Sequence, residues 1–157
     1  MVDAHQRRVP AHPRTELLRQ ETREPRAPGL VAEIGGEAAG WVRLGPRTRQ
    51  RRLARTRLFG PNSPEPWDDH TVWAVSCFSV RKEFRRQRVA TALLSGAVDF
   101  ARDHGARVIE GYPIDTSAGQ VGSNELYIGA LRTFLDAGFT ETARPRADRA
   151  IVALGLR

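Results

Sequence analysis

Residues 80–94, "VRKEFRRQRVATALL", decide the fold because they join an apolar strand to an amphipathic helix. The strand is "TVWAVSCFSV", residues 71–80, whose β-branched and aromatic residues are apolar on both faces, as in the middle of a sheet. The helix is expected over 86–104, where apolar residues recur at i, i+3 and i+4 and Gly105 follows as a stop signal. The stretch is therefore a turn from a central strand into a helix.

A further strand is expected directly after this helix, in "ARVIEGYPI", residues 106–114. Strand, helix and strand then form a βαβ crossover, which implies parallel pairing and a right-handed connection. Upstream, Leu30 to Ile34 and Ala38 to Leu44 flank Gly35-Gly36 and predict a β-hairpin.

The C-terminal part predicts a second helix and a second strand pair. The helix is expected over Asn124 to Ala137, stopped by Gly138, and the two strands are joined around Pro145 to Asp148. The pattern indicates an α/β (α+β) fold: a mixed, mostly antiparallel sheet with a central parallel βαβ unit and helices on both faces. We expect one domain over 29–157, after a weakly structured segment, 1–28, with one short helix at Arg14 to Arg23.

Composition excludes several classes of protein. The chain has 157 residues, 40% of them hydrophobic and 27% charged, which is typical of a globular domain. No apolar run approaches the ~20 residues that a membrane helix requires, and the N-terminus lacks an apolar signal-peptide centre, so we expect a cytoplasmic protein with no membrane partner. The single cysteine, Cys77, sits in an apolar strand and is interpreted as a small hydrophobe rather than a nucleophile. The four histidines have no metal-ligand spacing, so no metal site is expected.

The positive charge is carried almost entirely by arginine. The formal net charge is +7, and Lys82 is the only lysine. The densest basic run, Arg47 to Phe59, has no interleaved aromatic residues on which bases could stack. We interpret this run as a solvated connection, and nucleic acid is disfavoured as a partner.

The turn before the helix has the geometry of an anion site. A helix has free N–H groups in its first turn, and here they point beyond the carboxyl end of a central strand. Successive amides from Arg85 to Ala90 are expected to cradle a pyrophosphate, with the helix dipole adding about 0.3–1 kcal/mol. A helix that reads DNA bases would need a polar exposed face that tolerates phosphates. On this helix the exposed face carries Asp99 and Asp103, whose carboxylates would repel phosphates. The sequence therefore favours a loop that holds a phosphorylated cofactor.

These residues also resemble a known family. "VRKEFRRQRVATALL", followed by "GARVIEGYPID" and later "LYIGALRTFLDAGF", is similar to the GNAT superfamily of acetyl-CoA-dependent N-acetyltransferases. The family's loop pattern, Arg or Gln, two residues, Gly, one residue, then Gly or Ala, falls on residues 85–90. The resemblance covers about residues 29–157 and implies acetyl-CoA as cosubstrate and an amine, on a small molecule or a protein, as acceptor. A homodimer is left open.

The resemblance implies a set of cofactor-binding residues. The end of the central strand would supply an amide to stabilise the oxyanion, and the loop would hold the pyrophosphate. The implied residues are Phe78, Ser79, Val80, Arg85, Arg86, Gln87, Arg88, Val89, Ala90 and Thr91.

The sequence departs from the family pattern in three places. Arg88 stands at the usual first glycine, and we interpret it as already helical, so that its side chain fits. Phe134 replaces a tyrosine that often protonates the departing thiolate, and Tyr127, two turns earlier on the same face, is the candidate acid or an anchor for the helix. The 28 residues before the hairpin are too few for the strand and two helices that normally precede it in the family. Whether the first strand is present therefore stays an open question at this point.

The candidate general base is Glu110. Alternation along "VIEGY" places it with Val108 and Tyr112 on one face of its strand, and a carboxylate in apolar company would have a raised pKa. A hydrogen-bonded structural role is the alternative, and Asp68, Asp69 and His70 are other candidates for the base. The rival functions are a GNAT-like protein that binds CoA without transferring acetyl groups, and an arginine-rich nucleic-acid module.

Overall fold

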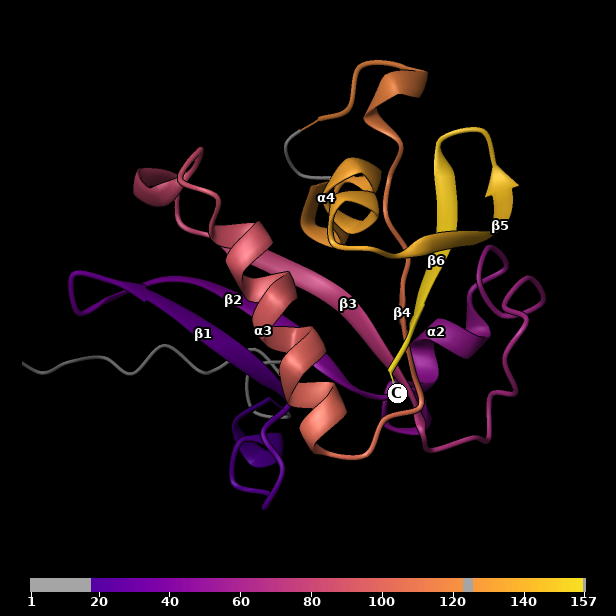
Figure 1. Ribbon diagram of the computed structural model, residues 1–157, viewed down its shortest axis with the longest axis horizontal. Helices are drawn as coiled ribbons and strands as arrows, with labels where there is room; N and C mark the ends of the chain where they lie inside the picture. The colour runs from indigo at the N-terminus through magenta and orange to yellow at the C-terminus, as the bar shows by residue number, and fades with distance from the viewer. Residues whose placement is uncertain (1–17, 123–125, 157) are drawn as a thin grey trace, which may run out of the picture.

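The computed structural model describes residues 18–122 and 126–156. Within these residues the chain forms a six-stranded sheet in the order β1-β2-β3-β4-β6-β5 (Figure 1). The strands are β1 Gly29–Ile34, β2 Glu37–Pro46, β3 Val72–Val80, β4 Val108–Gly111, β5 Thr140–Arg146 and β6 Arg149–Gly155. The α-helices are α2 Arg51–Arg55, α3 Val89–Asp103 and α4 Leu131–Asp136, and the short 3-10 helices are η1 Arg47–Arg49, η2 Lys82–Phe84, η3 Thr116–Ala118 and η4 Leu126–Ile128.

The strand pairing confirms the predicted fold class. β1 and β2 form the hairpin around Gly35-Gly36, where both glycines have positive φ, as a tight turn requires. β3 and β4 are parallel and joined by α3, while the other pairs in the sheet are antiparallel. The parallel pair is short, running only from Val72 opposite Val108 to Val75 opposite Gly111.

The main core lies between one face of the sheet and helices α3 and α4. α3 contacts β1, β2 and β3, lying across them in Figure 1. Its apolar stripe is buried as its spacing predicts. From the sheet, Trp73 and Val75 of β3 join this cluster.

The opposite face carries a smaller cluster under α2. Ala74, which points away from Trp73 and Val75, is buried with Tyr112 and Ile151. Leu53 of α2 and Phe59 pack against them, with the Phe59 and Tyr112 rings 4.6 Å apart. Helices therefore cover both faces, as the sequence predicts.

Two helix predictions are wrong in their extent. The helix expected over 124–137 is confined to α4, residues 131–136, and η4 precedes it. Gly129 has φ 88° between the two, a conformation outside the right-handed helix. The expected start, Asn124, lies outside the described residues. Of the helix expected over 14–23, residues 18–21 are helical and 14–17 also lie outside the described part of the chain.

Candidate functional site

β3 and β4 part at their carboxyl ends. Their ladder stops at Val75 and Gly111, and β3 continues to Val80 paired only with β2 in the described sheet. η4 contacts β3 in this region. The end of a parallel pair where the strands separate is a common place for a ligand in sheets of this kind.

A hollow of about 620 Å³ opens at this end of β3. It brings together the predicted residues at the end of the strand, the loop before α3 and the candidate acid Tyr127. Its lining is Phe78, Ser79, Val80, Arg85, Ala90, Leu126, Tyr127, Gly129, Ala130 and Thr133.

A second hollow, of about 350 Å³, continues along the loop. It shares Val80, Arg85 and Ala90 with the first. Its other lining residues are Phe84, Arg86, Arg88 and Val89. Of the ten predicted cofactor-binding residues, eight line one or both hollows. Gln87 and Thr91 line neither.

The loop before α3 has an unusual backbone. Arg86 and Arg88 have φ of 63° and 59°, in the left-handed region that glycine enters without steric cost. α3 begins only at Val89, so the prediction of a helix from Arg86 is wrong by one turn. The interpretation of Arg88 as helical is also wrong, since it is the left-handed residue that precedes the helix. The sharp turn explains why glycine suits this position in the family pattern.

This backbone leaves a row of free donors. Among the described residues, no carbonyl accepts from the amides of Arg86 to Thr91. Alternation of left-handed and ordinary residues makes successive N–H groups converge on a small concavity that attracts anions. The α3 N-terminus, at the end of a 15-residue helix, adds its dipole to the same place. The geometry therefore suits a phosphate group.

The carboxylate of Glu110 points to the other face of the sheet, into a buried polar network that does not line the hollow. Its Oε2 accepts from Arg47 at 2.8 Å and from the Tyr112 hydroxyl at 3.0 Å, and Oε1 accepts from the Ser63 hydroxyl at 2.9 Å. Both the Arg47 and Glu110 side chains have zero exposure. Burial, together with the Glu110 charge, raises the pKa of Tyr112 well above its ordinary value.

Arg47 is the residue that sequence reasoning missed. Besides Glu110 and Ser63 it donates to the carbonyls of Glu65 and Pro66 at 2.9 and 2.7 Å, and its guanidinium lies 4.1 Å from the centre of the Trp67 ring. It therefore fixes loop 60–67 against β4. The sequence offers no signal that distinguishes Arg47 from the exposed arginines that follow it.

The alternative bases lie at the other end of β3. Asp69 accepts from the Thr71 amide and hydroxyl and from Arg107, and these hydrogen bonds, that with Arg107 first, lower the pKa of Asp69. Six residues of strand separate Val72 from Phe78, or ~20 Å. The structure therefore does not bring residues 68–70 to the hollow.

Cys77 is half-buried on β3. Burial raises the pKa of its thiol, with Arg43 opposing the shift. A protonated thiol is a poor nucleophile, which agrees with the interpretation of Cys77 as a small hydrophobe.

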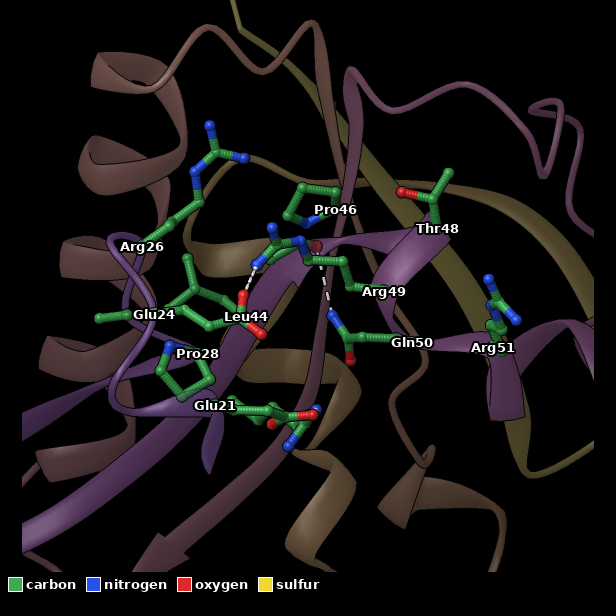
Figure 2. Close-up of a pocket in the computed structure, with 13 residues that line it drawn as sticks. Glu21, Glu24, Arg26, Pro28, Leu44, Pro46, Thr48, Arg49, Gln50 and Arg51 are labelled. Carbon is green, nitrogen blue, oxygen red and sulfur yellow. Dashed lines mark hydrogen bonds and ion pairs between the residues drawn. The ribbon is translucent and has the colours of Figure 1, made fainter. Parts of the chain in front are cut away.

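A separate hollow of about 330 Å³ lies between residues 21–28 and residues 43–51 (Figure 2). Four of its charged side chains form two ion pairs: Arg43 binds Glu21 at 2.8 Å, and Arg49 binds Glu24. Figure 2 also shows Gln50 donating to the Gly45 carbonyl, at 3.2 Å. These contacts hold the segment before β1 against the end of β2.

The described residues contain no group of three or more His, Cys, Asp or Glu that could hold a metal ion. Their helices are all too short or too polar to cross a membrane.

Residues 2–129 match the sequence profile described as the acetyltransferase (GNAT) family, which is most of the chain. Among curated proteins, none matches the sequence. Solved structures of low sequence identity share the fold.

One is the GNAT domain of S. lividans PAT, with a TM-score of 0.51 and 23% identity, covering 82% of this chain and 60% of that one. Another is a ribosomal-protein-alanine N-acetyltransferase from Brucella melitensis, with a TM-score of 0.57 and 18% identity over 91% of this chain and 76% of that one. A third is a putative acetyltransferase from Staphylococcus aureus MU50, with a TM-score of 0.57 and 14% identity over 93% and 82% of the two chains. The chain thus spans about 60% of the length of the first of these.

Proposed function

Because the chain belongs to the acetyltransferase (GNAT) family, whose members use an acyl-CoA, we propose that it transfers an acetyl group from acetyl-CoA to an amine. The observation that carries this proposal is the row of free amides at the start of α3, which adjoins a hollow of about 620 Å³. An anion site beside a hollow of this size suits a molecule with a pyrophosphate and a long, uncharged arm.

In this proposal the pyrophosphate binds the amides of the loop, with Arg85 beside it. Arg85 lines both hollows, so its guanidinium can reach an anion in either one. The pantetheine arm then runs through the larger hollow along Phe78 to Val80, which places the thioester near the point where β3 and β4 separate. Gln87 and Thr91 remain proposed contacts through their backbone amides.

The chemistry is a direct acyl transfer. The amine nitrogen attacks the thioester carbonyl, an amide of β3 near Phe78 to Val80 stabilises the oxyanion, and the C–S bond then breaks to release CoA as a thiolate. One proton must leave the nitrogen and one must reach the sulfur. Positioning supplies much of the rate, because a thioester is already reactive.

The two candidate catalytic residues have different surroundings. Tyr127 lines the hollow and is 55% exposed, so its hydroxyl is available to protonate the thiolate. Glu110 has both oxygens occupied by Arg47, Ser63 and Tyr112. Glu110 does not line the hollow, so its proposed role as general base is indirect: it would accept a proton relayed by the Ser63 or Tyr112 hydroxyl, both of which donate to it.

Cofactor binding is tested with a matched pair of variants in the first turn of α3. Ala90 lines both hollows, whereas Ala92 is exposed and lines neither. Ala90→Trp should abolish the rise in Tm that CoA produces, and Ala92→Trp should leave it unchanged. Calorimetry that finds no binding of CoA at millimolar concentration to the unaltered protein would contradict the proposal.

Catalysis is tested by turnover of acetyl-CoA with a panel of amines. If Tyr127 is the acid, Tyr127→Phe should lower kcat by about 100-fold and remove the high-pH limb of the rate profile. If it only anchors η4, the variant should keep its rate and lose stability. Binding of acetyl-CoA without turnover on any amine would favour a non-catalytic CoA-binding protein.

A further inference from the structure

We infer that Phe134 limits the acyl group to a short chain, an inference that rests on the proposed function. Phe134 stands in α4 and is fully buried. Its phenyl ring lies where β3 and β4 separate.

Two glycines and a phenylalanine enclose the ring. A Cβ added at Gly111, the last residue of β4 paired with β3, would lie 2.2 Å from Phe134 Cε1. A Cβ added at Gly129 would lie 2.7 Å from Cε2, on the other edge of the ring. Phe78 of β3 meets the ring edge-on, with centroids 6.0 Å apart. The ring therefore spans the gap between the two strands.

Phe134 does not itself line the larger hollow, but it packs against two residues that do. Phe78 and Gly129 line that hollow, and Phe134 lies directly behind both. An acyl chain that continued from the thioester between the separated strands would meet the ring edge. An acetyl group ends before it, but each further methylene would have to displace a tightly packed aromatic side chain.

The test measures affinity, so it needs no knowledge of the acceptor. Calorimetry compares CoA, acetyl-CoA and hexanoyl-CoA on the unaltered protein and on Phe134→Leu. The unaltered protein should bind hexanoyl-CoA at least about 10-fold more weakly than acetyl-CoA, since even one methylene can cost that much in a closed pocket. Phe134→Leu should bring the two affinities within about threefold of each other, and leave that of CoA unchanged.

Phe139→Leu is the matched control. Phe139 is buried and packs edge-on against Phe134 at 5.1 Å, but the contacts with Phe78 and Gly129, which line the hollow, are made by Phe134. It should lower stability and keep the preference for acetyl-CoA. Phe134→Met serves in the same way as Phe134→Leu if the latter does not fold.

Three results would overturn the inference. Equal affinities for acetyl-CoA and hexanoyl-CoA in the unaltered protein would show that the ring is no barrier. If both folded Phe134 variants keep the unaltered ratio of acetyl-CoA to hexanoyl-CoA affinity, Phe134 does not set that ratio. The same conclusion follows if Phe139→Leu changes the ratio as much as Phe134→Leu does. Failure to bind CoA at all would instead overturn the proposed function, and the inference with it.

Discussion

Two arginine-rich segments, residues 47–57 and residues 81–88, are alike in sequence and different in structure. In the first, Arg47 is fully buried and holds loop 60–67 against β4 through Glu110 and two backbone carbonyls. In the second, the arginine side chains are exposed, and two of them take left-handed backbone conformations that free a row of amides.

The difference teaches that what an arginine contributes depends on where it stands in the fold. Arg47 is a hydrogen-bonding hub, because five N–H donors in a rigid plane can serve several acceptors at once. At Arg86 and Arg88 the backbone matters more, since the concavity is made by N–H groups that any residue other than proline carries. The four predictions that follow test this comparison.

The largest effect is expected at the buried arginine. Arg47→Met should lower the free energy of unfolding by about 3–5 kcal/mol, because it leaves the Glu110 carboxylate buried without its partner. Arg52→Gln, in the same segment but exposed, should change it by about 0.5 kcal/mol or less. Urea denaturation measures the free energy of unfolding of both variants. Comparable losses would show that the buried Arg47 contributes no more to stability than the exposed Arg52.

Arg85 tests whether side-chain charge contributes in the second segment. Arg85→Gln should weaken CoA binding by about threefold to tenfold and reduce its dependence on salt, because one exposed charge no longer faces the anion. Arg51→Gln, in the first segment, should leave the affinity unchanged. Calorimetry at low and high ionic strength makes the comparison, and an equal effect of both variants would point to overall charge instead.

Arg88 tests the role of the backbone. Arg88→Gly and Arg88→Ala remove the same charge, but only glycine enters the left-handed region without strain. The glycine variant should therefore be more stable than the alanine variant by about 0.5–1 kcal/mol, after allowing for the greater freedom of glycine in the unfolded chain. Thermal unfolding of the pair decides it, and a less stable glycine variant would argue against the strained turn.

The smallest effect is expected at Arg107, an exposed arginine that binds loop 60–67 and the residues just after it. Arg107 binds Glu65 and Asp69 at 2.7 and 2.8 Å on the surface. Arg107→Gln should lower Tm by no more than about 3 °C at neutral pH, since exposed ion pairs contribute little.

This small contribution should also depend on pH. The hydrogen bond from Arg107 lowers the pKa of Asp69 in the folded protein. The stabilisation that the Arg107–Asp69 pair contributes is thus complete above the pKa of Asp69 in the unfolded chain, about 3.9. It is lost as the pH falls towards the lower pKa of Asp69 in the folded protein. The difference in Tm between Arg107→Gln and the unaltered protein should shrink below about pH 4, and a difference that grew there would contradict the assignment.

Local sequence patterns predicted most of the fold. Gly35-Gly36 between two β-prone runs and the apolar stripe of α3 are local signals, so the hairpin and the βαβ unit followed from them. The start of α3 was misplaced because the arginine at 88 is an ordinary helix residue by propensity, and its left-handed φ is imposed by the turn. α4 was predicted too long because an isolated glycine inside a helical pattern is often tolerated, whereas Gly129 takes a φ of 88° and separates η4 from α4.

The candidate site was predicted unevenly. The loop residues could be predicted because they occupy fixed places in a recognisable motif, whereas Tyr127 was chosen only by its spacing from Phe134, which holds the usual tyrosine position. Most of these residues line the two hollows. The hydrogen bonds of Glu110 could not be found, because Arg47 and Ser63 come from distant segments that meet only in the folded chain. The packing of Phe134 between two glycines is likewise a tertiary contact.

The Arg47–Glu110 pair also bears on the kinetics of folding. The two residues are 63 positions apart, so their contact closes a long loop, and we expect it to form late in folding. Interactions that form after the transition state do little to the folding rate and chiefly slow unfolding. We therefore expect this hub to lengthen the lifetime of the native state, and with it the protein's resistance to irreversible inactivation.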